Sequence, residues 1–85
     1  MDNLEWTDDA VEDLEKLDKP IAKRVLSKIT WLSQHFNHIT PEPLSGELSG
    51  MFKLRIGDWR VVYTLEEDVI LIRAIGHRRE IYNLL

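Results

Sequence analysis

Two alternating runs of residues joined by Gly57-Asp58 constrain the fold of this chain more than any other feature. In the first run, Phe52–Ile56, three apolar side chains alternate with two cations, as in a strand that buries one face. Gly-Asp is typical of a two-residue hairpin turn, so the second run, Trp59–Leu65, is expected to fold back beside the first. The resulting register pairs Ile56 with Trp59, Arg55 with Arg60, and Lys53 with Val62, and it gathers Trp59, Val61, Tyr63 and Leu65 on the apolar face.

This register places Arg55 directly opposite Arg60, where two like charges destabilise a sheet. Two interpretations follow. An anion such as a phosphate can bind between the guanidinium groups and relieve the repulsion. Alternatively, the face is a solvated polar surface on which the two side chains splay apart.

The composition indicates one small domain, spanning residues 1–85, without a metal site. A hydrophobic fraction of 44% suits a globular core. The chain has no cysteine, which excludes disulfides and thiolate metal sites. His35, His38 and His77 lack the pattern of a metal site, so we expect them on the surface. No apolar run has the length of a membrane span, and residues 1–3 lack the basic start of a signal peptide, which favours a cytoplasmic protein.

The net charge of −4 is unevenly distributed along the chain. Residues 1–50 carry 5 Lys and Arg against 10 Asp and Glu, whereas residues 51–85 carry 6 against 5. A protein with this balance will not hold nucleic acid by bulk charge. Any contact with RNA or DNA must therefore be local, or arranged by a third molecule.

The first half of the chain predicts a short strand, Asn3–Trp6, and two helices. Thr7 is a favourable N-cap for a first helical turn that contains two aspartates. Apolar residues recur at helical spacing on both sides of Pro20, and a proline suits the first turn of a second helix. We therefore expect an antiparallel helical hairpin. Trp31 lies off the apolar stripe and marks a second contact face.

The second half of the chain predicts the rest of the sheet. Asn37–Pro43 has the prolines of a loop, and Val69–Ile75 is a nearly continuous apolar run that suits a central strand buried on both faces. A two-residue turn before this strand would pair Arg73 with Val62 and add a fourth phosphate-binding side chain to the cationic face. The predicted fold class is α+β, with the helical hairpin packed on one face of a twisted, mainly antiparallel sheet of three to four strands.

Four fragments, in this order, resemble the RelE/ParE superfamily of toxins from bacterial type II toxin–antitoxin systems, and RelE more closely than ParE. The fragments are Leu44 with Leu48-Ser49-Gly50, then Lys53-Leu54-Arg55, then Gly57-Asp58-Trp59-Arg60-Val61-Val62-Tyr63, and finally Gly76-His77-Arg78-Arg79-Glu80-Ile81-Tyr82. Each fragment is weak alone, but together with the helical hairpin they span nearly the whole chain and are specific.

The resemblance implies a ribosome-dependent endonuclease that cuts messenger RNA without a metal ion or other cofactor and so inhibits translation. The 2′-OH of the RNA attacks the adjacent phosphate, which leaves a 2′,3′-cyclic phosphate and a 5′-OH. The matched positions are Lys53, Arg55, Arg60, Arg78 and Tyr82. Cations fixed before the reaction would stabilise the charge that builds on the phosphate oxygens, and Arg78 would neutralise the leaving group.

The resemblance also suggests a role for each of the other matched side chains. Arg60 is the candidate for a bidentate phosphate contact, with Arg55 beside it. Lys53 would stabilise the phosphorane, or act as a base if its neighbours lower its pKa. Tyr82 would stack on a nucleobase or accept the proton of the nucleophile.

A second assignment comes from YoeB-type relatives, which use a glutamate, an arginine and a histidine. Met51 stands where RelE proper has a further lysine, which weakens the case for a lysine base. Pro41-Glu42-Pro43-Leu44 matches the segment that carries the glutamate in YoeB. Glu42 would then be the base, Arg60 the phosphate clamp and His77 the acid. The choice of base among Tyr82, Glu42, Lys53 and His77 stays open.

Two other functions remain compatible with the sequence. One is that of ParE-type relatives, which poison DNA gyrase by binding rather than by catalysis. The other is that of a catalytically inactive relative kept as the binding partner of an antitoxin or as a co-repressor. The resemblance implies a small RelB-like antitoxin as partner, together with the ribosome and messenger RNA, and contact with DNA only through the antitoxin.

Overall fold

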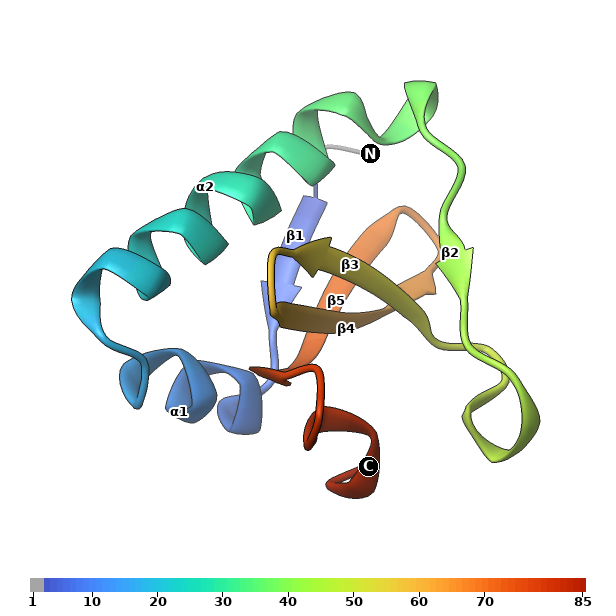
Figure 1. Ribbon diagram of the computed structural model, residues 1–85. Coiled ribbons are helices and arrows are strands. Elements are labelled where there is room, and N and C mark those ends of the chain that lie inside the picture. The colour runs from blue at the N-terminus through green and yellow to red at the C-terminus, as the bar shows by residue number, and fades with distance from the viewer. Residues whose placement is uncertain (1–2) are drawn as a thin grey trace.

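The hairpin predicted around Gly57 lies in the middle of a five-stranded sheet that carries two helices on one face (Figure 1). The computed structural model describes residues 3–85, so residues 1 and 2, on which part of the signal-peptide argument rests, lie outside it. The strands are β1 (Asn3–Trp6), β2 (Glu42–Pro43), β3 (Phe52–Ile56), β4 (Trp59–Glu66) and β5 (Val69–His77). The helices are α1 (Asp8–Glu15) and α2 (Lys19–His35), and three short 3-10 turns cover Phe36–His38, Gly46–Leu48 and Ile81–Asn83.

The predicted register of the β3–β4 hairpin is confirmed. Ile56 pairs with Trp59, Arg55 with Arg60, and Lys53 with Val62. Leu54, Val61 and Tyr63 are buried on the face that the helices cover, as the alternation of apolar residues predicts. The cations therefore extend from the opposite face of the sheet, which we call the open face.

Both predicted helices form, and each begins where its capping residues predict. Thr7 caps α1, because its hydroxyl accepts a hydrogen bond of 3.1 Å from the amide of Ala10. Pro20 occupies the first turn of α2, where a missing N–H costs nothing. α1 packs mainly on β5, whereas α2 lies over β3. Within residues 3–85, neither helix combines the length and apolar character needed to cross a membrane.

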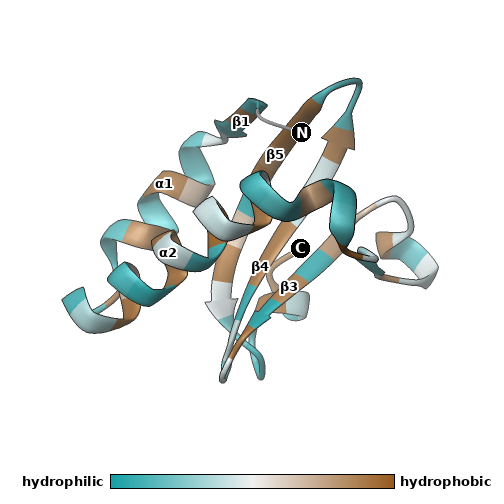
Figure 2. Ribbon diagram, turned by 90° about the horizontal axis from the view of Figure 1, so that it is seen from above, coloured by the Kyte–Doolittle hydropathy of each residue, from teal (hydrophilic) through white to brown (hydrophobic). Residues whose placement is uncertain are grey.

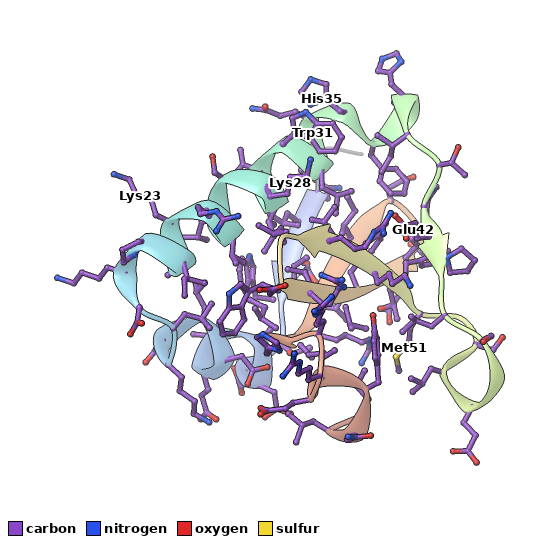
Figure 3. The ribbon with its side chains drawn as sticks, viewed as in Figure 1. Lys23, Lys28, Trp31, His35, Glu42 and Met51 are labelled. Carbon is purple, nitrogen blue, oxygen red and sulfur yellow. The ribbon has the colours of Figure 1, made fainter. Side chains whose placement is uncertain are left out.

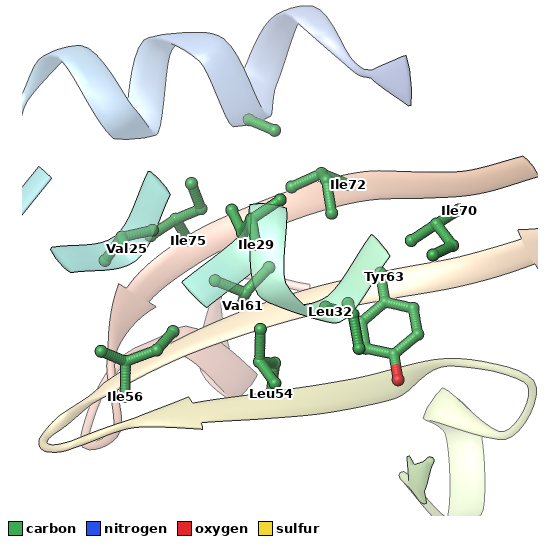
Figure 4. Packing of buried hydrophobic residues seen from close by; sticks show 11 residues of the cluster. Val25, Ile29, Leu32, Leu54, Ile56, Val61, Tyr63, Ile70, Ile72 and Ile75 are labelled. Carbon is green, nitrogen blue, oxygen red and sulfur yellow. The ribbon is translucent and has the colours of Figure 1, made fainter. Parts of the chain in front are cut away.

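The main core lies between the helices and the sheet (Figure 4). It is built from one apolar stripe of α2 and from alternate residues of the three long strands. Its fully buried members include Val25, Ile29, Leu32, Val61, Tyr63, Ile70 and Ile72. Strand β5 is mostly apolar, and the turn that joins it to β4 is hydrophilic (Figure 2), as expected for a central strand and an exposed turn.

The sheet has more strands than the three to four that were predicted. Its order is β1-β5-β4-β3-β2, and β1 pairs with β5 in parallel. Strand β2 lies in the segment predicted as a loop, where Glu42 pairs with Lys53 and Pro43 with Phe52. A strand of two residues has no periodicity to detect, and its proline suits only an edge position.

The predicted pairing of Arg73 with Val62 is wrong, because a β-bulge interrupts β5. Val62 pairs with Ala74, whereas Tyr63 pairs with Ile72, so Arg73 is the extra residue. Its side chain stays on the open face, where the guanidinium donates to the Thr64 hydroxyl at 2.8 Å and contacts the Glu66 carboxylate at 3.1 Å. The expected double burial of β5 is also only partial: on its open face Val69, Leu71 and Arg73 remain half-exposed, whereas Ala74 is buried.

A small apolar cluster covers part of the open face. Val62, Ala74 and Ile81 are buried in it, and Leu44, Met51 and Tyr82 pack against them. The 3-10 turn Ile81–Asn83 supplies the outer layer. A Cβ at Gly76 would lie 3.0 Å from a methyl group of Ile81, so glycine allows this turn to seat closely on the sheet.

Candidate functional site

A cleft of about 470 Å³ lies between α2, the segment 39–42 and the β3–β4 hairpin. Its lining residues are Lys28, Trp31, Ile39, Thr40, Pro41, Glu42, Lys53, Leu54, Arg55, Gly57, Arg60 and Tyr63. Four of them were predicted from the sequence as site residues, namely Glu42, Lys53, Arg55 and Arg60. Strand β2 pairs with β3 only as far as Lys53, so the cleft occupies the edge of β3 that β2 leaves uncovered.

Arg55 forms an ion pair with Glu42 at the rim of this cleft. Its Nη2 and Nε atoms both lie 3.2 Å from Oε1 of Glu42. The side chains are 60% and 44% exposed, and an ion pair in contact with water contributes little stability. Arg55 can therefore exchange this partner for a phosphate at small cost.

Arg60 turns toward the hairpin backbone. Its Nη1 atom donates to the carbonyl oxygens of Gly57, at 2.7 Å, and of Trp59, at 2.9 Å. Arg55 and Arg60 are paired in register but have different partners, which corresponds to the splayed arrangement. These carbonyl contacts hold the Arg60 guanidinium against the turn without neutralising its charge.

Lys53 is half-buried in the cleft, beside the Glu42–Arg55 pair. Among residues 3–85, no ion pair or hydrogen bond engages its ammonium group. Glu42 is its partner in the β2–β3 register. A carboxylate and an ammonium group thus belong to directly paired residues of two short strands.

Tyr63 also lines the cleft, although sequence analysis assigned it only to the apolar face. Its ring stacks on Phe52 with 5.7 Å between centroids, and its hydroxyl is directed away from β5 (Figure 4). Burial, together with the nearby charge of Glu42, raises the pKa of Tyr63 to about 12. The hydroxyl therefore stays protonated at neutral pH and can donate a hydrogen bond.

The helix wall of the cleft was also missed by sequence analysis, apart from the unusual position of Trp31. The Lys28 Nζ atom lies 3.8 Å from the centre of the Trp31 ring, within the range of a cation–π interaction. Both side chains extend from the second half of α2 (Figure 3). Their spacing of three residues was a usable signal, but it did not indicate which strand they face.

His77 and Arg78, both predicted as site residues, do not line the cleft. The His77 ring meets the Trp59 ring edge-on at 5.5 Å between centroids. Arg78 forms an ion pair of 3.5 Å with Asp58, in the turn of the hairpin. Both residues thus lie beside the hairpin turn that the Arg60 guanidinium contacts.

Tyr82 and Arg73 also lie outside the cleft. Among residues 3–85, the buried Tyr82 hydroxyl has no hydrogen-bond partner, and the Tyr82 ring packs in the cluster that contains Met51. A buried hydroxyl in this state is destabilising. Arg73 lines a separate hollow of about 300 Å³ together with acidic residues of α1, so it does not join the other cations.

The histidines expected on the surface are largely there. His35 and His38 are exposed, and His77 is half-exposed. Within residues 3–85, histidine and carboxylate side chains form no group of three or more that could hold a metal ion.

Comparison with known proteins identifies the class to which this fold and cleft belong. A family model described as the ParE toxin of the type II toxin–antitoxin system parDE matches residues 4–82. The chain therefore belongs to this family and is a toxin of a type II toxin–antitoxin system. The predicted membership of the RelE/ParE superfamily is confirmed. No curated protein gives a significant match.

Solved structures from several toxin–antitoxin systems share this fold. A chain of the toxin–antitoxin complex RelBE2 from Mycobacterium tuberculosis aligns with a TM-score of 0.79 and 28% identity over 92% of both chains. The isolated RelE toxin of E. coli gives 0.73 and 17% over 91% of this chain and 84% of that one. The YoeB dimer from Staphylococcus aureus gives 0.68 and 23% over 88% and 94%. The last two likenesses show the fold alone.

Proposed function

We propose that this toxin is a ribosome-dependent messenger RNA endonuclease that needs no metal ion and inhibits translation. The observation that supports it is the convergence of Lys53, Arg55 and Arg60 with Glu42 in one cleft. Three cations suit a phosphodiester whose negative charge increases during the reaction. A carboxylate among them supplies a group that can accept a proton.

The proposed reaction is an internal transfer of the phosphate. The RNA 2′-oxygen forms a bond to phosphorus, the bond from phosphorus to the 5′-oxygen breaks, and a 2′,3′-cyclic phosphate remains. One proton leaves the 2′-OH and another is delivered to the departing 5′-oxygen. Arg60 and Lys53 would stabilise the phosphorane oxygens, and Arg55 would bind the phosphate after it leaves Glu42.

Glu42 is the proton acceptor in this proposal, because it shares the cleft with the three cations. Its ion pair with Arg55 holds the carboxylate at the rim, and binding of a phosphate by Arg55 would release it for proton transfer. Arg78 would neutralise the leaving group after separating from Asp58, an exposed pair that breaks at low cost. His77, next to it in the chain, would supply the proton. Tyr82 would take part in the reaction only if the 3-10 turn Ile81–Asn83 moves away from the sheet.

The ribosome and an antitoxin complete the proposal. The net charge of −4 opposes tight binding of free RNA, so the ribosome would present the message. The RelBE2 structure and the RelB–RelE structure from Methanococcus jannaschii are toxin–antitoxin complexes. We infer that this chain likewise binds a small RelB-like antitoxin in the cytoplasm and reaches DNA only through it.

The experiment is induction of the toxin in cells, with primer extension on a reporter message. Wild type should arrest growth and cut within translated codons. Arg60→Ala should abolish both, whereas Lys23→Ala, which removes a cation that points away from the sheet (Figure 3), should change neither. Undiminished cutting by folded Arg60→Ala protein would refute the proposed site.

A second candidate function is inhibition of DNA gyrase by binding, and the match to a ParE family model favours it. The same induction separates the two functions. Growth arrest with intact messages, continued translation and induced DNA damage would indicate gyrase. Intact messages without arrest would indicate an inactive relative that serves as an antitoxin partner.

A further inference from the structure

The two helices carry opposite charge. The total charge of residues 1–50 does not show this, because both helices lie within that range. The eight residues of α1 include five Asp and Glu and no Lys or Arg. The 17 residues of α2 include four Lys and Arg and no Asp or Glu. The strongly basic helix is the one that forms a wall of the cleft, so α2 extends the cationic character of the site beyond the sheet.

Four residues of α2 follow one side of the helix at spacings of four, three and four residues, namely Arg24, Lys28, Trp31 and His35. We call them the α2 stripe. Arg24 lies against the hairpin turn, because a Cβ at Gly57 would be 3.1 Å from its Nη2 atom. The stripe therefore begins beside the turn that holds Arg60 and continues past the cleft.

Trp31 is the centre of a stack within this stripe. The Lys28 ammonium group lies 3.8 Å from the centre of the ring. The His35 ring stacks on Trp31 with 5.0 Å between centroids and 20° between planes. His35 is oriented by a contact of 2.9 Å between its Nδ1 atom and the Trp31 carbonyl oxygen. Lys28 thus lies over the face of the indole ring, and a nucleobase can stack there in its place once the ammonium group moves to a phosphate.

A second hollow adjoins the cleft along this stripe. Its volume is about 350 Å³, and its lining residues are Arg24, Ser27, Lys28, Trp31 and Ile56. Lys28 and Trp31 line both hollows, so they form the wall between them. Trp31 and Ile56 supply apolar surface, while Arg24 and Lys28 supply charge at the rim.

We propose that the α2 stripe binds the RNA nucleotide next to the scissile phosphate. Its base would lie against Trp31 in the second hollow, and its phosphate would contact Arg24 and Lys28. This inference rests on the proposed function for the presence of RNA in the cleft. Charge complementarity selects RNA as the occupant, because a helix with four cations and no carboxylate suits a phosphate backbone.

The test measures binding of a fluorescein-labelled, fully 2′-O-methylated RNA of nine nucleotides by fluorescence anisotropy at several salt concentrations. Methylation removes the nucleophile, so the probe cannot be cut. Arg24→Ala and Lys28→Gln should each weaken binding and reduce the slope of log affinity against log salt by about 0.7, the value for one phosphate contact with a single strand. Lys28→Arg should restore the slope.

A separate variant tests the base contact. Trp31→Ala should weaken binding about tenfold or more, in the range found for loss of one stacked base, with the salt slope unchanged. Trp31→Phe retains a ring and should recover most of the affinity. Circular dichroism melts of all variants identify any loss of folding.

Lys23→Ala is the matched control, since it removes one cation from the same helix on a side that points away from the sheet. The inference is overturned if Arg24→Ala and Lys28→Gln bind the probe with the affinity and salt slope of Lys23→Ala, or if wild type does not bind it. It is also overturned if these variants retain RNA binding but lose the antitoxin, because the stripe would then be the antitoxin's surface.

Failure of this inference can be distinguished from failure of the proposed function. If wild type cuts ribosome-bound messages but the stripe variants bind the probe normally, the endonuclease stands and the inference fails. If wild type binds the probe through the stripe but cuts no message on the ribosome, RNA binding by the stripe stands and the endonuclease proposal fails.

Discussion

At the scale of single residues, the cleft brings together groups whose charges are only loosely compensated. Arg55 has an exposed carboxylate partner, Arg60 has two neutral carbonyl oxygens, and Lys53 has neither among the described residues. Weak partners are useful in a site that binds an anion, because little interaction energy is lost when the anion replaces them.

Tyr63 provides a test of the cleft that does not depend on activity. Its pKa is about 12 in the folded chain, against 10.0 for an ordinary tyrosine. Between pH 10 and 12 the unfolded chain therefore loses this proton before the folded chain does. The free energy of unfolding should fall over this range, by about 2–3 kcal/mol in full. Below pH 10 this stabilisation is fully present.

The measurement is urea unfolding at several pH values between 9 and 12, compared with Tyr63→Phe. The variant should lack this component of the decline, because it cannot titrate at position 63. Lysine titration occurs in both proteins and cancels in the comparison. Parallel curves for the two proteins would show that the Tyr63 hydroxyl is not buried beside Glu42.

The sequence predicted the part of the site whose residues alternate along the two strands of the hairpin. Lys53, Arg55 and Arg60 share one face of a regular hairpin, so their proximity could be deduced from a period of two and a turn type. Tyr63 and Trp31 could not be assigned to the cleft in this way. They reach it from the apolar face and from a helix, and their positions depend on how α2 packs against the edge of β3.

At the scale of secondary structure elements, Thr7 connects the first helix to the bulge in β5. Its hydroxyl accepts from the Ala10 amide at 3.1 Å and contacts the Arg73 carbonyl oxygen at 3.2 Å, while its own amide donates to Ile72 at 3.0 Å. One residue thus caps α1 and ties the helix to the strand. Asp13 adds a second link by accepting from the Ile75 amide at 3.0 Å.

Thr7→Ala should lower the free energy of unfolding by about 1–2 kcal/mol, because it removes the cap and leaves a half-buried carbonyl with one partner fewer. Thr7→Ser keeps the hydroxyl and should lose much less. Chemical denaturation measures both. Equal stability of Thr7→Ala and wild type would mean that the hydroxyl contributes neither contact in solution.

The same elements show why part of the fold was not predictable. The cap at Thr7 and the break before Pro20 are local signals, and both were identified correctly. The bulge at Arg73 lies where Thr7, 66 residues away, donates a hydrogen bond to the strand, and no local pattern in the sequence indicates that contact. The short strand β2 likewise exists only because β3 offers an edge to pair with.

At the scale of the whole molecule, the chain separates its charges despite a modest net value. Acidic α1 and basic α2 lie on the same face of the sheet, and the cleft opens beside the basic helix. A local cationic surface on an acidic protein binds free RNA only weakly, so tight binding needs another particle that positions the RNA. This arrangement agrees with action on the ribosome rather than on free RNA.

The most direct test of the proposed endonuclease uses purified translating ribosomes and a message with a single 2′-deoxy nucleotide at a mapped cut site. Attack by the 2′-oxygen requires that hydroxyl, so cutting should disappear at the substituted position and persist at other codons. The remaining upstream fragments should end in a 2′,3′-cyclic phosphate, and cutting should be absent without ribosomes. Undiminished cutting at the deoxy position would show that water attacks the phosphate and would contradict the proposed reaction.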